Sequence, residues 1–173
     1  MRVSLLTTVA TAAALVLASG CARQLVAQDP VTYRPASDDT AVLRHGLAYA
    51  PGTAPAVVYH AIEAGNRLQR MPYKLGGGHA HPYDYGYDCS GTVSYVLREA
   101  GLIEDAMPSK GYFNYGEKGP GRWITIYVCR GHVFMTVAGL RLDTGGDGAH
   151  TGPRWKPEIR EARGLVLRHP PGL

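Results

Sequence analysis

Apolar side chains recur at helical spacing in two segments of the chain. In residues 53–71 they fall three and four positions apart, which predicts an amphipathic helix capped by Thr53 and ended by Pro72. A second helix is predicted behind Asp88, with Val93, Val96, Leu97 and Ala100 on its apolar face. Asp88 is a favourable N-cap and Gly101 a favourable stop, so this segment is the best-defined helix of the sequence.

Beyond Pro108 the pattern changes to short runs that are typical of β-strands. These runs cover residues 123–128, 132–138, 140–144 and 165–168. The second and third runs are close enough to form a tight hairpin around Gly139. Helices followed by antiparallel strands predict an α+β domain, in which the sheet packs on the helix that begins at Asp88.

The first 21 residues have the pattern of an export signal. Arg2 is followed by an uncharged stretch, residues 3–17, and then by small residues up to Cys21. This stretch is short for a membrane-spanning helix and has no basic cluster after it, so residues 1–20 are predicted to be a cleaved signal peptide. The segment from Leu17 to Cys21 resembles a bacterial lipobox, which implies acylation of Cys21 and a membrane anchor. An ordinary signal peptide with an incidental Cys21 is the alternative.

The segment that follows carries turn residues and no sustained apolar period. Residues 21–52 are therefore interpreted as a lipid anchor and flexible tether, and residues 53–173 as the folded domain. As an alternative, residues 41–49 pack on the domain. Ala22 is not the Asp that retains lipoproteins in the inner membrane. By resemblance to lipoprotein sorting, the protein is expected on the periplasmic face of the outer membrane in a cell that has two membranes.

Composition and charge limit the classes of partner. The chain has 173 residues, of which 45% are hydrophobic, and this length suits one catalytic or binding domain with appendages. Its 22 Gly and 12 Pro indicate many loops and exclude a simple helix bundle. The formal net charge is +4, without any run of Lys or Arg, so no nucleic-acid partner is expected.

Cys89 is the first candidate for chemistry. It follows the cap residue Asp88, so its sulfur is predicted to lie at the positive end of a helix dipole, which favours the thiolate over the thiol. A small buried cysteine in the first helical turn is the alternative. His132 at the start of a predicted strand is a natural general base for such a nucleophile, although a lone histidine there is more often structural.

Three sequence elements together resemble the NlpC-type papain-like cysteine peptidases, which cut peptidoglycan peptides. They are Tyr73 before a Gly-rich loop, Asp88-Cys89-Ser90-Gly91 at the start of a helix, and Gly131-His132-Val133 at the start of a strand. The resemblance covers residues 56–144 and implies the NlpC fold, with a Cys-bearing helix packed on a small antiparallel sheet.

The same resemblance implies a function and a set of roles. Cys89 would be the nucleophile, His132 the base, and Tyr73, Asp88 and Ser90 would contact substrate or its oxyanion. The expected protein is an exported, monomeric lipoprotein that hydrolyses peptidoglycan stem peptides through a thioester, without a cofactor. The loop from Gly78 to Tyr87 is longer than the family commonly has and is expected to line the cleft.

The third catalytic residue departs from the family, which uses His, Asn or Gln. Only Asp143 and Thr144 are placed to orient the imidazole of His132. A two-residue hairpin loop puts Asp143 on the same sheet face as His132, whereas a loop of odd length puts Thr144 there. Asp143 is preferred, because two-residue loops are the commonest and a carboxylate forms a charge-assisted hydrogen bond; His150 is the next candidate.

Other readings of the same residues give different functions. Zinc could be held by His79, His81 and the pair Cys129 and His132, but no acidic partner stands at metal spacing, so no metal is expected. A disulfide between Cys89 and Cys129 would leave the domain inert. A CHAP-like amidase would apply the same thiol chemistry to the bond between sugar and peptide. A non-catalytic wall-binding lipoprotein would lack the third catalytic residue.

Overall fold

A computed structural model describes residues 38–145, 151–157 and 160–173. The predicted signal peptide, the lipidation residue Cys21 and the candidate His150 lie outside the described residues. The helices are α1 (Ala56–Arg67), α2 (Cys89–Glu99) and the 3-10 helix η1 (Ser109–Asn114). The strands are β1 (Val42–Arg44), β2 (Leu47–Tyr49), β3 (Glu117–Lys118), β4 (Ile124–Cys129), β5 (His132–Val137), β6 (Leu140–Asp143), β7 (Arg154–Lys156) and β8 (Val166–His169).

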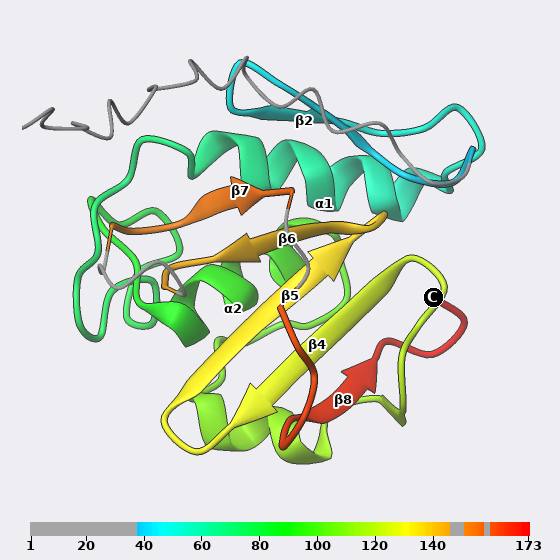
Figure 1. The fold of residues 1–173 in the computed structure, drawn as a ribbon. Coiled ribbons are helices and arrows are strands. Elements are labelled where there is room, and N and C mark those ends of the chain that lie inside the picture. Colours follow the sequence, from blue (N-terminus) through cyan, green and yellow to red (C-terminus); the bar gives the residue numbers. More distant parts are fainter. Residues whose placement is uncertain (1–37, 146–150, 158–159) are drawn as a thin grey trace, which may run out of the picture. The chain divides into compact units, whose positions relative to one another are not determined.

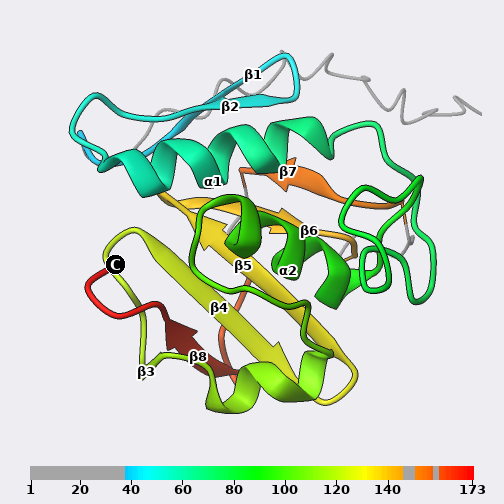
Figure 2. The same ribbon diagram turned by 180° about the vertical axis from the view of Figure 1, so that it is seen from behind.

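One six-stranded antiparallel sheet organises the domain. Its strand order is β3-β8-β4-β5-β6-β7, so two consecutive hairpins, β4–β5 and β5–β6, occupy its centre (Figure 1). Both long helices lie on one face of this sheet, as the view from behind shows (Figure 2). The fold class is therefore α+β, as predicted.

Helix α2 packs against the central strand β5. The buried side chains of α2 include Val93, Val96 and Leu97, and they share one core cluster with Met135 and Val137 of β5. Side chains alternate across a strand, so the residues of β5 between these core positions face the other side of the sheet. This packing confirms the expected contact between the Cys-bearing helix and the sheet.

Helix α1 begins later than the sequence pattern predicted. Its N-cap is Pro55, which has an extended backbone and no side-chain cap. Thr53 was expected to cap this helix, and that prediction was wrong. Its hydroxyl instead donates a hydrogen bond to the Asp39 carboxylate at 2.8 Å. The regular helix ends at Arg67, and a turn leads from there to Met71.

The β1–β2 hairpin packs on the domain and is not part of the tether. Ala41 and Ala48 are fully buried in the core cluster. The amide side chain of Asn66 in α1 accepts a hydrogen bond from the Ala48 N–H at 2.8 Å and donates one to the Ala48 carbonyl at 2.9 Å. The domain therefore includes residues before 53, which corrects the boundary drawn from the turn residues and agrees with the alternative for residues 41–49.

The four predicted strand runs correspond to β4, β5, β6 and β8, each within one or two residues of its expected ends. Strand β7, which completes the edge of the sheet beside β6, was not predicted. None of the helices in the described ranges combines the length and apolar character that crossing a bilayer requires.

Candidate active site

The N-terminus of α2 is held by the side chain of Asp88. One carboxylate oxygen accepts a hydrogen bond from the Gly91 N–H at 2.7 Å, and the other accepts one from the Gly76 N–H at 2.9 Å. Cys89 is the first residue of the helix, beside N–H groups that have no partner within the helix. The cap therefore fixes the position of the Cys89 sulfur at the positive end of the helix dipole.

The Gly-rich loop lies against the first turn of α2 at van der Waals distance. A Cβ on Gly91 would come within 1.9 Å of the Gly77 carbonyl oxygen. Because that oxygen belongs to the backbone, it cannot move aside as a side chain can. Glycine at position 91 is thus required for the contact that fixes the loop beside Cys89.

His79 completes the polar network around the cap. Its Nε2 lies 3.1 Å from Asp88 Oδ1 and 3.1 Å from Ser90 Oγ, and the Ser90 hydroxyl donates to the same carboxylate oxygen. The structure therefore places the side chains of Asp88 and Ser90 in the cap, and their expected contact with substrate stays a prediction. The part of the chain that the structure describes contains no group of three or more metal-ligating residues around His79 or elsewhere.

His132, the first residue of β5, contacts both Cys89 and Asp143. Its Nε2 lies 2.9 Å from Asp143 Oδ1, which leaves Nδ1 for the hydrogen bond with Cys89. The hydrogen bond to Asp143, followed by that to Cys89, raises the pKa of His132 to about 9, although burial opposes the rise. This raised pKa favours the protonated imidazole, the form that can give a proton to a leaving group.

Asp143 ends β6 and its side chain is completely buried. The same oxygen that meets His132 also accepts the Gly145 N–H at 3.0 Å. Its other oxygen lies 3.5 Å from the Arg160 guanidinium and 3.8 Å from that of Arg141. Burial acts to raise the pKa of Asp143, but the hydrogen bond from His132 and the neighbouring positive charges hold it below its ordinary value. Asp143 is accordingly a buried anion with cationic neighbours.

The β5–β6 turn explains why Asp143 and not Thr144 meets the histidine. The loop is Ala138-Gly139, because Val137 pairs directly with Leu140. This is the two-residue loop that the sequence predicted, and it puts Asp143 on the face of His132. The Thr144 hydroxyl is buried and has no hydrogen-bond partner among the described residues.

Tyr73 lies beside the same site. It forms an isolated bridge with Tyr87 in the loop that leads to α2. Burial raises the pKa of its hydroxyl, and negative charge on Cys89 and Asp88 raises it further. Tyr73 therefore lies in the segment that leads to the N-terminus of α2, and its contact with substrate or its oxyanion stays a prediction.

Cys129 lies directly opposite His132 in the β4–β5 ladder. Both Cys89 and Cys129 are free thiols in the structure. Sequence reasoning proposed Cys129 only as a disulfide or metal partner and did not predict its position beside the histidine. The two residues flank a tight turn, and the spacing of Cys129 and His132 around Arg130-Gly131 is the signal that could have shown it.

Neither a protein-family model nor a curated protein sequence matches the chain. Solved structures do resemble it. The peptidoglycan hydrolase RipB from Mycobacterium tuberculosis has a TM-score of 0.51 and 21% sequence identity, over 67% of this chain and 68% of RipB. The resuscitation promoting factor interacting protein RipA, mutated at a histidine, has a TM-score of 0.50 and 24% identity, over 79% of this chain and 74% of RipA. The described domain therefore shares its fold with these two proteins, in agreement with the fold that its cysteine and histidine motifs had indicated.

Proposed function

We propose that this protein is a cysteine peptidase that hydrolyses peptide bonds in the stem peptides of peptidoglycan. The observation that carries the proposal is the continuous contact from Cys89 through His132 to Asp143, with 2.9 Å between His132 Nε2 and Asp143 Oδ1. The likeness of the fold to RipA and RipB supports peptidoglycan as the substrate.

The first half of the reaction forms a thioester. The Cys89 thiolate attacks the carbonyl carbon of the scissile amide, and the electron pair of the C=O bond moves onto oxygen. The backbone N–H of Cys89 and the hydroxyl of Tyr73 are the proposed donors to that oxyanion. When the tetrahedral intermediate collapses, the C–N bond breaks and the His132 imidazolium gives its proton to the departing amine.

The second half returns the enzyme to its starting state. Neutral His132 takes a proton from a water molecule, whose oxygen attacks the thioester carbonyl. The C–S bond then breaks, the peptide leaves as a carboxylic acid, and Cys89 is again a thiolate beside an imidazolium. Asp143 accepts the second N–H of the ring throughout, which fixes its orientation and stabilises its positive charge.

Mass spectrometry of purified muropeptides tests this function. Wild-type protein should release fragments with a new amino terminus inside the stem peptide, and Cys89→Ala should release none. Cys129→Ala removes the other described thiol and is the matched control, which should retain activity. Release of an intact stem peptide from the sugar would support the amidase instead, and intact muropeptides with the wild type would favour the wall-binding alternative.

We also propose that Cys21 carries lipid and tethers the domain to the outer membrane in a cell with two membranes. The support comes from the sequence pattern: one basic residue, a short apolar stretch, and small residues before the cysteine. An anchored domain with a tether of several residues can reach the polymer that lies next to the membrane.

A further inference from the structure

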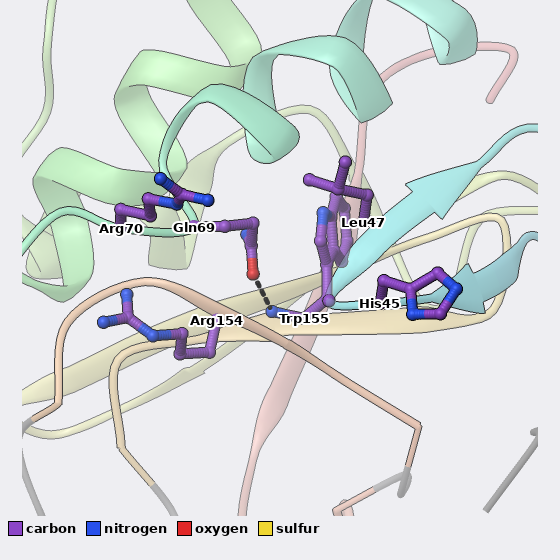
Figure 3. Close-up of a pocket in the computed structure, with 7 residues that line it drawn as sticks. His45, Leu47, Gln69, Arg70, Arg154 and Trp155 are labelled. Atoms are coloured by element: carbon purple, nitrogen blue, oxygen red, sulfur yellow. Dashed lines mark hydrogen bonds between the residues drawn. The ribbon is translucent and has the colours of Figure 1, made fainter. Parts of the chain in front are cut away.

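A cavity lies on the domain at the junction of the β1–β2 hairpin, the end of α1 and strand β7. It measures about 280 Å³ and is lined by His45, Gly46, Leu47, Gln69, Arg70, Arg154 and Trp155. Figure 3 shows the guanidinium groups of Arg70 and Arg154 on one side and the hairpin residues His45 and Leu47 on the other. The volume is at the small end of the range for ligand pockets and suits a group of the size of one or two amino-acid residues.

The lining is cationic and holds no carboxylate. Arg154 is fixed through one guanidinium nitrogen, which donates to the Met71 carbonyl at 3.0 Å and to the Pro153 carbonyl at 2.6 Å. Among the described residues, no carboxylate forms an ion pair with Arg154 or Arg70. A guanidinium group without a protein anion is a natural receptor for a carboxylate, which it binds through two parallel hydrogen bonds.

The apolar part of the pocket is rigid. Trp155 is 5% exposed, and a Cβ on Gly65 would come within 2.3 Å of its ring, so the indole fits against α1. Its indole N–H donates to Asn66 Oδ1 at 2.9 Å, and its backbone N–H donates to Gln69 Oε1 at 2.8 Å (Figure 3). Leu47, which also lines the pocket and is 39% exposed, offers an apolar surface beside the cations, as a ligand with an aliphatic body and a charged end requires.

The hairpin tip brings a third polar group to the rim. His45 has a backbone φ of 51°, in the left-handed region that residues other than glycine seldom adopt. Gly46 follows with φ 79°, so the two residues form the tight turn between β1 and β2. This unfavourable backbone conformation holds an exposed imidazole at the pocket, and such strain is often retained at binding sites.

We propose that this pocket binds the carboxylate-bearing end of a peptide, with the carboxylate between Arg70 and Arg154 and the last side chain against Trp155. That the peptide is a peptidoglycan stem rests on the function proposed above. Arg154 connects the pocket to the segment before Tyr73, since it donates a hydrogen bond to the carbonyl of Met71. The backbone of Arg154 also lies directly opposite that of Asp143 in the β6–β7 ladder. The pocket thus selects stems with a free terminal carboxylate.

Binding is measured by calorimetry with the full-length Cys89→Ala protein, which holds the peptide without cleaving it. The probes are a stem tetrapeptide with a free terminal carboxylate, the same peptide amidated at its terminus, and N-acetyl-alanine as a minimal free carboxylate. The tetrapeptide with a free carboxylate should bind about tenfold more tightly than its amidated form, since a hydrogen-bonded ion pair contributes free energy on this scale. The tetrapeptide should also bind more tightly than N-acetyl-alanine.

Two variants connect this preference to the pocket. Arg70→Gln removes a guanidinium that forms no hydrogen bond or ion pair with the residues that the structure describes, and it should abolish the preference for the acid without changing the melting temperature. Arg163→Gln removes another exposed charge, which lies outside the pocket, and should leave the preference intact. Equal affinity for acid and amide, or a preference that survives Arg70→Gln, would overturn the proposal. N-acetyl-alanine binding as tightly as the tetrapeptide would overturn the peptide as occupant.

The outcome is independent of turnover. If wild-type protein cleaves no muropeptide yet the acid preference depends on Arg70, the proposed reaction is wrong and the pocket stands. If wild-type protein cleaves muropeptides but does not distinguish acid from amide, the pocket assignment alone is wrong.

Discussion

Replacing Asp143 by Asn tests the link between the buried carboxylate and the candidate base. The two side chains have the same shape, so the change removes negative charge while it preserves the packing of β6. His132 would keep a neutral hydrogen-bond partner but lose the anion that stabilises its protonated form. The pKa of His132 should therefore fall, and the imidazolium should be lost at lower pH.

The size of the effect follows from the environment of His132. Its pKa rises from the ordinary 6.5 to about 9, and the hydrogen bond to Asp143 is the largest cause. At about 1.4 kcal/mol for each pH unit, this rise corresponds to about 3 kcal/mol in favour of the imidazolium. Cys89 supplies the next contribution, so the Asn variant should lose a large part of the rise but not all of it, about one to two pH units.

The assay is the dependence of kcat/KM on pH with a purified muropeptide. The imidazolium must protonate the leaving amine, so wild-type activity should fall with rising pH around a midpoint near 9. In Asp143→Asn this alkaline midpoint should move down by about one to two pH units, and kcat should decrease as well.

Thr144→Val is the matched control on the next residue. The Thr144 hydroxyl is buried without a hydrogen-bond partner in the described part of the chain, so its removal should leave both stability and the pH profile close to wild type. An unchanged alkaline midpoint in Asp143→Asn, in a variant that folds normally by circular dichroism, would refute the assignment of Asp143 as the orienting residue. A lower alkaline midpoint in Thr144→Val but not in Asp143→Asn would assign the orienting role to Thr144 instead.

Three further outcomes are expected. At pH 6, iodoacetamide should modify Cys89 much faster than Cys129, because only Cys89 lies at a helix N-terminus; peptide mass spectrometry measures both rates in one sample, and equal rates would contradict the thiolate. Gly91→Ala should lower the free energy of unfolding in urea by at least about 2 kcal/mol through its backbone clash, whereas Gly52→Ala, which has open space around it, should change little. Cys21→Ser should move the protein from the membrane fraction to the soluble fraction, and retention in the membrane would exclude the lipid anchor.

The features that the sequence predicted well depend on neighbouring residues. Helix α2, its cap and its stop are specified within residues 88–101, and the cap hydrogen bond from Gly91 to Asp88 is formed as expected. The β5–β6 hairpin is equally local, since a two-residue turn sets the register of both strands. Local signals were therefore sufficient to bring the cysteine-bearing helix and the histidine-bearing strand into one predicted domain.

The features that the sequence did not predict depend on contacts between distant segments. Strands β1, β2 and β7 have three residues each, too few to show an alternating pattern. They are stabilised by partners far along the chain: Asn66 holds Ala48, and Gln69 holds Trp155. The cavity with Arg70 and Arg154 arises only from this assembly, so no motif could have revealed it.

The assignment of Asp143 shows how a local rule and a nonlocal environment combine. The even length of the β5–β6 loop puts Asp143 on the sheet face of His132. It does not determine whether the carboxylate can remain ionised there when its side chain is completely buried. Burial alone favours the neutral acid, which would donate a hydrogen bond to a neutral imidazole and give the imidazolium form of His132 no counterion. Arg160 and Arg141, at 3.5 and 3.8 Å from the free carboxylate oxygen, offset that penalty. They approach from the C-terminal segment and from β6, so the last strands and the loops between them are what keep the orienting residue charged.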